Sequence, residues 1–224
     1  MSEGTDFLYP FIEGDERDTA ALLRDLAASA EGKGAVSSAL QRATLDREAP
    51  AIDAAAAAMA QRFAGGGQLF TFGNGGSSTD AASLASLFAR PAWGAALPAR
   101  CLADDSAVLT ALANDVGFDL VFSRQLIAHA EPGDIALGIS TSGNSRNVLV
   151  ALEEATRRGL MTVGIAGYDG GEMGASEHVR HCLVVRDDSV HRVQETQAAL
   201  GDALWHGVQE RMSAGAVTSE VSGG

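Results

Sequence analysis

Short apolar runs alternate with helix-length segments from residue 68 onward, and this alternation constrains the fold more than any other feature of the chain. The runs predict five strands, at residues 68–72, 99–102, 134–139, 161–166 and 181–185. The intervening segments predict helices, one ending at about residue 90 and the others at 106–113, 118–130, 145–158 and 190–212. Strands separated by helices of this length predict an α/β fold with three layers, in which a doubly wound parallel sheet lies between helices.

The segment before the first strand has apolar residues at helical spacing. It predicts N-terminal helices over residues 17–64, in three pieces that end near Gly32 and Gly34 and again at Pro50. Residues 17–212 are expected to form a single domain, whose α/β core covers residues 68–212, because no low-complexity linker divides them. The two ends, 1–16 and 213–224, lack a clear period and are expected to be flexible.

Two loops rich in glycine and serine follow the first and third predicted strands. Residues 140–147 read Ser-Thr-Ser-Gly-Asn-Ser-Arg-Asn and lead directly into a helical pattern. A helix N-terminus carries unpaired N–H donors and a partial positive charge, and hydroxyl side chains add further donors, so this loop predicts a phosphate site. A capping role alone would need only one or two of the hydroxyls.

The other loop, Gly73–Ser78, is less specific. Its glycines permit close approach of a ligand to the backbone, but a tight turn between strand and helix with a capping serine would look the same. It departs from the dinucleotide-binding pattern, because Ser78 occupies the position of the last glycine, and no lysine follows to make a P-loop. Ligands of parallel sheets bind at the carboxyl ends of the strands, where both loops are expected.

The composition of the chain argues against several ligands and locations. The formal net charge of −13 argues against direct binding of nucleic acid, which needs clustered lysine and arginine. No apolar stretch approaches 18 residues, so no membrane span is expected. Cys101 and Cys182 lie far apart and outside any CxxC motif, and no secretory signal opens the chain, so a cytoplasmic location is expected.

Five motifs, taken together, resemble the SIS (sugar isomerase) domain in its single-domain phosphoheptose isomerase branch. In chain order they are Gly73–Ser77, Ala113–Asp115, Gly138–Ser145, Gly167–Gly171 and Arg192–Glu195. The resemblance spans about residues 20–212. It implies a five-stranded flavodoxin-like sheet, N-terminal helices that help to build a homotetramer, and a phosphorylated sugar held at a subunit boundary.

The resemblance also implies roles for individual residues. Four hydroxyl residues of the second loop would hold the phosphate: Ser140, Thr141, Ser142 and Ser145. Residues implied to face the sugar are Asn74, Gly75, Ser77, Asp105 and Gln194.

Departures from the family pattern concern the catalytic centre. Family isomerases interconvert an aldose and a ketose through an enediol, using a glutamate that also holds zinc together with two histidines and a glutamine. At the matching positions this chain has Leu87 for the glutamate, and Ser83 and Asp202 for the histidines, so that only Gln194 remains. Leucine neither accepts a proton nor ligates a metal, so we expect the family's zinc to be lost and the usual mechanism to be blocked.

The last predicted helix offers a substitute. His191, Glu195 and Asp202 share roughly one face of this predicted helix. His191 and Glu195, at i and i+4, could act as an acid/base pair, and we take these two residues as the catalytic candidates. His191 stands where family members carry an aspartate. The alternative is that these side chains are solvated surface charges.

Two classes of function remain open from the sequence. The first is an isomerase of a phosphorylated sugar, acting on a seven-carbon ketose phosphate or a relative, with an altered catalytic site. The second is a non-catalytic regulator or sugar-phosphate sensor, because the same branch includes a protein that binds the bacterial replication initiator DnaA and also lacks the helix glutamate. A replication initiator is therefore one possible protein partner.

Overall fold

The computed structural model describes residues 19–221, with side chains described at 23, 24, 27 and 30–214. The chain divides into two compact units, one up to Ala39 and one from Leu40 onward, and the second contains the whole sheet. The expected flexible segment 1–16 lies outside the described residues. No helix in the described part is long and apolar enough to cross a membrane.

All five predicted strands are present and form one parallel sheet. They are β1 (Leu69–Gly73), β2 (Ala99–Cys101), β3 (Ile135–Ser140), β4 (Met161–Gly167) and β5 (His181–Val185). Their order in the sheet is β2-β1-β3-β4-β5, the doubly wound order of flavodoxin-like folds. Strands β1, β3 and β4 are buried along their whole length, which explains why they appear in the sequence as continuous apolar runs.

The helices between the strands agree with the sequence pattern, with three differences. They are α2 (Gly76–Ala89), α3 (Ser106–Asp115), the 3₁₀ helix η1 (Phe118–Leu120), α4 (Val121–His129), α5 (Arg146–Arg157), α6 (Gly171–Ala175) and α7 (Val190–Val221). The predicted helix 118–130 is divided into η1 and α4, and the short α6 was not predicted. Helix α7 continues to Val221, past the predicted end at residue 212, and residues 222–224 lie outside the described part.

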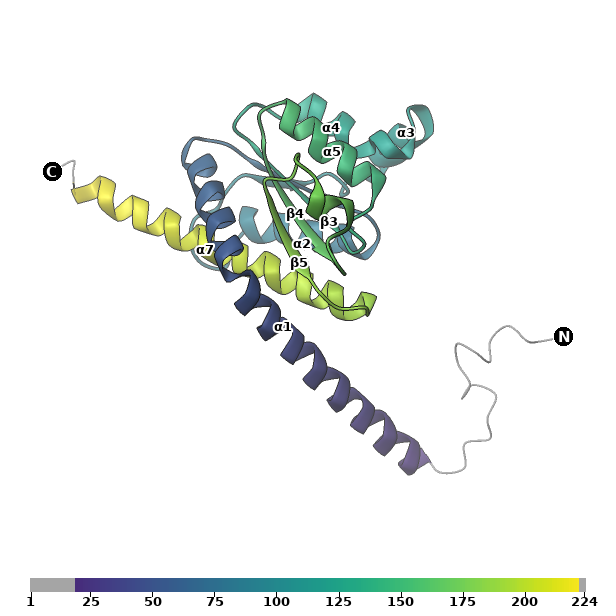
Figure 1. Cartoon of the computed structure of the whole chain (residues 1–224). Helices are drawn as coiled ribbons and strands as arrows, with labels where there is room; N and C mark the ends of the chain where they lie inside the picture. Colours follow the sequence, from purple (N-terminus) through teal and green to yellow (C-terminus); the bar gives the residue numbers. More distant parts are fainter. Residues whose placement is uncertain (1–18, 222–224) are drawn as a thin grey trace. The chain divides into compact units, whose positions relative to one another are not determined.

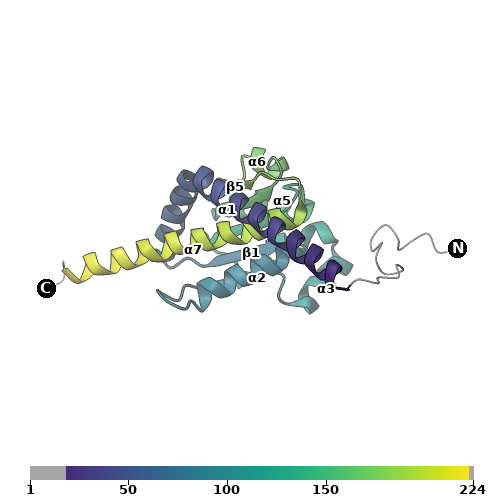
Figure 2. The same cartoon turned by 90° about the horizontal axis from the view of Figure 1, so that it is seen from below.

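Helices cover both faces of the sheet and enclose two apolar cores. One core joins residues 52–63 of α1 (Thr19–Ala64) to α2, α7 and the sheet, and its largest buried side chains include Met59 and Phe88. The other joins α4 and α5 to the opposite face around Phe72 and Phe122, whose rings pack 5.4 Å apart. Figure 1 shows α5 and α7 on opposite sides of the strands, and Figure 2 shows α7 beside α2 along the sheet. The three-layer architecture is therefore confirmed.

The N-terminal segment corrects the sequence analysis. Residues 19–64 form one helix, α1, instead of three pieces. A glycine in a helix interior costs only about 1 kcal/mol, so Gly32 and Gly34 do not end the helix. Pro50 lies inside α1, where it lacks an N–H donor, but the flanking residues 52–63 pack into the core and offset that loss. Tertiary packing thus outweighs the local signal.

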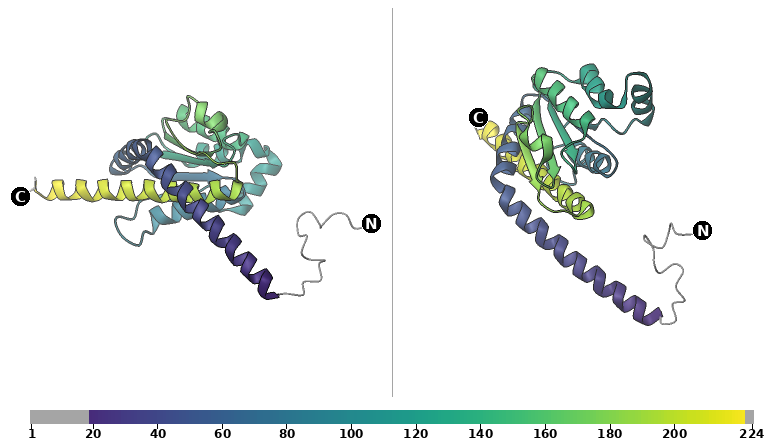
Figure 3. Two further views of the ribbon diagram at one scale, coloured as in Figure 1. Left: turned by 60° about the horizontal axis from the view of Figure 1, so that its bottom comes forward. Right: turned by 45° about the vertical axis from the view of Figure 1, so that its right-hand side comes forward.

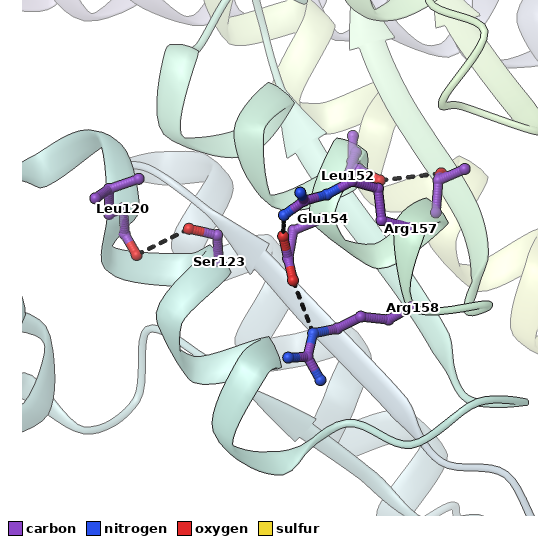
Figure 4. Close-up of polar contacts among 7 residues, drawn as sticks. Leu120, Ser123, Leu152, Glu154, Arg157 and Arg158 are labelled. Atoms are coloured by element: carbon purple, nitrogen blue, oxygen red, sulfur yellow. Dashed lines mark hydrogen bonds and ion pairs between the residues drawn. The ribbon is translucent and has the colours of Figure 1, made fainter.

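Three charged side chains interact at the C-terminal end of α5. Figure 4 shows the Glu154 carboxylate between the guanidinium groups of Arg157 and Arg158, with a 2.8 Å bond from Arg158 Nε. Glu154 is 8% exposed, so the two arginines compensate a largely buried charge. On the neighbouring α4, Ser123 donates to the Leu120 carbonyl at 3.2 Å. These contacts lie within the helix layer formed by α4 and α5. The right-hand view of Figure 3 shows this layer on the opposite side of the sheet from α7.

Candidate functional site

The two glycine- and serine-rich loops meet at the point where the sheet changes direction. Strands β1 and β3 are neighbours, with Gly73 opposite Ile139 at their carboxyl ends, so the loops that follow them lie side by side. Ser77 Oγ is 3.5 Å from Thr141 Oγ1, which joins the start of α2 to the second loop. The crevice at such a switch point is where doubly wound sheets bind ligands.

A pair of amides ties the same two loops together. Asn74 and Asn147 exchange two side-chain hydrogen bonds, of 2.8 and 2.9 Å. Asn147 is 2% exposed and lies in the first turn of α5. The sequence analysis singled out Asn74 but had no signal for its partner, because an asparagine in a first helical turn is common.

The hydroxyls of the second loop converge. We call residues 140–145 the phosphate loop, after the phosphate site that the sequence predicts there. Ser140 Oγ lies 2.9 Å from Ser145 Oγ and 3.5 Å from Ser142 Oγ. Ser145 is the residue before α5, yet its side chain makes no capping hydrogen bond to the helix. Its hydroxyl therefore belongs to the serine cluster, and the positive end of the α5 dipole points at that cluster.

A third loop, at the carboxyl end of β4, packs against the phosphate loop. Met173 N–H donates to the Gly143 carbonyl at 2.9 Å, and Glu172 N–H donates to Asn144 Oδ1 at 2.8 Å. Gly143 has φ +67°, and a Cβ there would collide with the carbonyl of Gly170. The glycine at 143 is thus required both by its backbone conformation and by this close approach.

The three positions at which the chain departs from the family pattern line one cavity. Ser83 and Leu87 from α2 and Asp202 from α7 border a space of about 350 Å³ beside the end of β3. The remaining lining residues are Asp80, Leu84, Ile139, Gln197, Ala198 and Gly201. These donors do not fit the family's zinc, because Leu87 and Ser83 cannot replace a glutamate and a histidine. The described residues contain no group of three histidine, cysteine or acidic side chains that could hold a metal ion.

Two oxygen atoms of this cavity lining lack a hydrogen-bond donor among the described residues. They are Asp80 Oδ2 and Gln197 Oε1, both fully shielded by surrounding atoms. Burial raises the pKa of Asp80 above its usual value. A buried acceptor without a donor is costly, so each oxygen calls for a functional explanation. The sequence analysis missed both residues, because a polar side chain within a helix gives no signal by itself.

Two of the expected sugar-facing residues have structural partners. The side-chain amide of Gln194 lies over Gly76, so close that a Cβ on Gly76 would overlap it. Gln194 on α7 is therefore brought to the start of α2, beside the first loop. Asp105 caps α3, since its Oδ1 accepts hydrogen bonds of 3.0 Å from the N–H groups of Ala107 and Val108.

The candidate catalytic pair lies elsewhere on α7. His191 and Glu195 are both exposed, near the first residue of that helix, and neither is among the residues that line the cavity. Asp202 does line it and is within 3.7 Å of His206 one turn further along α7. The assignment of His191 and Glu195 stays a prediction, whereas the positions 83, 87 and 202 are brought together.

Comparisons with known proteins agree with this geometry. The family model described as SIS domain matches residues 34–167. Phosphoheptose isomerases of Solidesulfovibrio magneticus and Chlorobaculum tepidum are 45% and 42% identical over 159 and 185 residues. These matches cover 68% and 79% of this chain, and 74% and 86% of the relatives.

Solved structures lead to the same family. Phosphoheptose isomerase from Neisseria gonorrhoeae superposes with a TM-score of 0.75 at 33% identity, over 83% of this chain and 99% of that one. The enzyme from Francisella tularensis gives 0.76 at 29% identity, over 82% and 98%. With five strands in the flavodoxin-like order and a serine-rich loop at the switch point, the chain belongs to the SIS domain family, in its phosphoheptose isomerase branch.

Proposed function

We propose that this protein binds a phosphorylated sugar, with the phosphate group held by the phosphate loop. The observation that carries the proposal is the convergence of three hydroxyls at the N-terminus of α5, where Ser140 Oγ lies within 3.5 Å of both Ser142 Oγ and Ser145 Oγ. Three hydroxyls and a helix dipole at one point suit a phosphate, whose oxygens accept several hydrogen bonds. Thr141, held near Ser77, extends the donor set toward the first loop.

The sugar would extend from the phosphate loop toward the first loop and α2. Asn74, Gly75 and Ser77 border that path, and Gln194 reaches it from α7. Relatives at 42–45% identity are phosphoheptose isomerases, which makes a seven-carbon sugar phosphate the first ligand to test. Free thiols at Cys101 and Cys182 suit a protein of the reduced cytoplasm.

Catalysis in this chain would differ from that of the family. Leu87 puts an apolar side chain into the cavity where the family has its glutamate, so we propose that the protein holds no zinc there. It would act either as an isomerase with another base or as a sensor that binds without turnover. Leu87 favours the second candidate, a regulator whose protein partner, such as a replication initiator, responds to the bound sugar phosphate.

Thermal stabilisation tests the phosphate site. Sedoheptulose 7-phosphate at roughly a hundred times its dissociation constant is expected to stabilise the native state by about 2.7 kcal/mol, because the ligand binds only the folded protein. Replacing Ser140 and Ser142 together by alanine is expected to abolish the shift in melting temperature. Ser106→Ala, at the start of α3, is a matched control that keeps it. An equal shift in the double variant would rule out the phosphate loop.

Assembly is the second testable part. We expect a homotetramer, measured by light scattering at micromolar concentration. An apolar groove of about 510 Å³ runs between α1 and α7 in the second unit, lined in part by Leu45, Ile52 and Ala203. Trp205 of α7 is 3% exposed and packs against Trp93, so its side chain is already covered within one chain. The exposed groove is therefore the observation that supports a homotetramer, and a monomer at this concentration would contradict this expectation.

A further inference from the structure

Two hydrogen-bond acceptors of the residues that line the cavity between α2 and α7 have no donor among the described residues. Gln197 is 1% exposed and donates through Nε2 to the carbonyls of Ser140, at 3.5 Å, and Ile165, at 3.3 Å. Carbonyl oxygens only accept hydrogen bonds, so the amide cannot be turned around, and its Oε1 is left as the atom without a partner. The orientation of this acceptor is thus fixed by the protein.

Asp80 supplies the second acceptor. It lies one turn after Ser77 on α2, so the same helix connects the first loop to the cavity. Its Oδ2 is shielded from solvent and has no donor among the described residues. An ionised carboxylate in such a place requires donors, and none of the apolar lining residues, such as Leu84 and Leu87, can provide them.

The cavity adjoins the phosphate loop directly. Ile139 lines the cavity and precedes Ser140 in β3, and the Gln197 amide bonds to the Ser140 carbonyl. A ligand with its phosphate in the loop would therefore have the rest of its chain next to the cavity. The two acceptors require hydrogen-bond donors from this part of the ligand. Sugar hydroxyl groups are donors that carry no charge.

We propose that Asp80 and Gln197 accept hydrogen bonds from hydroxyl groups of the phosphorylated sugar, and so select a polyhydroxylated ligand. This inference rests on the proposed function, because it assumes that the phosphate loop anchors the same molecule. It assigns to Asp80 a role in specificity that does not depend on turnover. Both acceptors are unpaired and shielded in the free state, so neighbouring side chains have to move aside to admit the hydroxyl groups that pair them.

Binding of two probes to the full chain, measured by calorimetry at pH 7, tests the inference. The probes are inorganic phosphate and sedoheptulose 7-phosphate. The Asp80→Asn variant is expected to bind sedoheptulose 7-phosphate about tenfold more weakly or worse, since a neutral amide replaces the charged acceptor, and to bind phosphate unchanged. Simple electrostatics predicts the opposite sign, because removing a negative charge near an anionic ligand would tighten binding.

Controls separate this inference from the proposed function. Asp119→Asn, the same substitution at an exposed site in η1, should leave both affinities unchanged. Ser83→Leu fills the cavity from an exposed helix position, so it should weaken sugar-phosphate binding alone, even if Asp80→Asn fails to fold. If the wild-type protein binds sedoheptulose 7-phosphate, and Asp80→Asn binds it equally or more tightly, the inference alone is overturned. The same holds if Ser83→Leu does not weaken binding of sedoheptulose 7-phosphate. A wild-type protein that binds neither probe would overturn the proposed function and the inference with it.

Discussion

Turnover of sedoheptulose 7-phosphate by this protein is expected to be about 10²–10⁴-fold slower than by a phosphoheptose isomerase that carries the family glutamate, because general acid–base catalysis contributes about that much. The residue at the corresponding position is Leu87, which lines the cavity and cannot accept a proton. The measurement is the initial rate of aldose formation at equal enzyme concentration and saturating substrate, with and without added zinc. We expect zinc to leave the rate of this protein unchanged.

Two variants identify a replacement base if turnover is nevertheless fast. His191→Ala or Glu195→Ala should then lower kcat by most of that factor with little change in KM, because a base acts in the transition state and not in binding. Fast, zinc-dependent turnover that neither variant affects would contradict this interpretation of the site. Sugar-phosphate binding without turnover would agree with the sensor.

Gly143→Ala is expected to destabilise the protein by about 3 kcal/mol, through a left-handed backbone conformation and a collision with backbone. Gly143 has φ +67°, and a Cβ there would lie 2.6 Å from the carbonyl carbon of Gly170. Urea unfolding at equilibrium measures the change in the free energy of unfolding.

Gly66→Ala is the matched control for this substitution. Gly66 also has positive φ, +86°, but a Cβ there would meet no atom within 4 Å, so only the conformational cost of about 1 kcal/mol applies. The difference between the two variants measures the collision with Gly170. Equal losses would show that the β4 loop can move aside at no cost.

The sheet could be predicted from the sequence because β1, β3 and β4 are buried along their whole length and so leave continuous apolar runs. The partly buried edge strands β2 and β5 also lie where the sequence predicts strands. The single N-terminal helix could not be predicted in this way. Gly32, Gly34 and Pro50 are local signals for helix ends, and the packing of residues 52–63 outweighs them. Helix α6 is only five residues long and has no hydrophobic period to detect.

The candidate site, too, could be predicted only in part from the sequence. Hydroxyl density and position singled out residues 140–145 as a candidate phosphate site, because the loop is contiguous in the sequence, and the structure brings three of its hydroxyls together. The family resemblance singled out three lining residues of the cavity, Ser83, Leu87 and Asp202. The rest of the lining could not be predicted, because it comes from α2, β3 and α7 and meets only in the folded chain. Asp80 stands in an alanine- and serine-rich helix, where one acid suggests a surface position. Its buried oxygen becomes evident only when its neighbours are known.

The hydrogen bonds from Met173 and Glu172 to the phosphate loop have a consequence for local motion. Residues 143–144 cannot separate from residues 172–173 without breaking both bonds, so the two segments are expected to open as one cooperative unit. A ligand that immobilises the serine hydroxyls would then also slow the opening of the β4 loop, although it touches no atom there. Hydrogen exchange at the backbone amides of Glu172 and Met173 would thereby report ligand binding at residues 140–145, and a surface that includes α6 would be coupled to that binding.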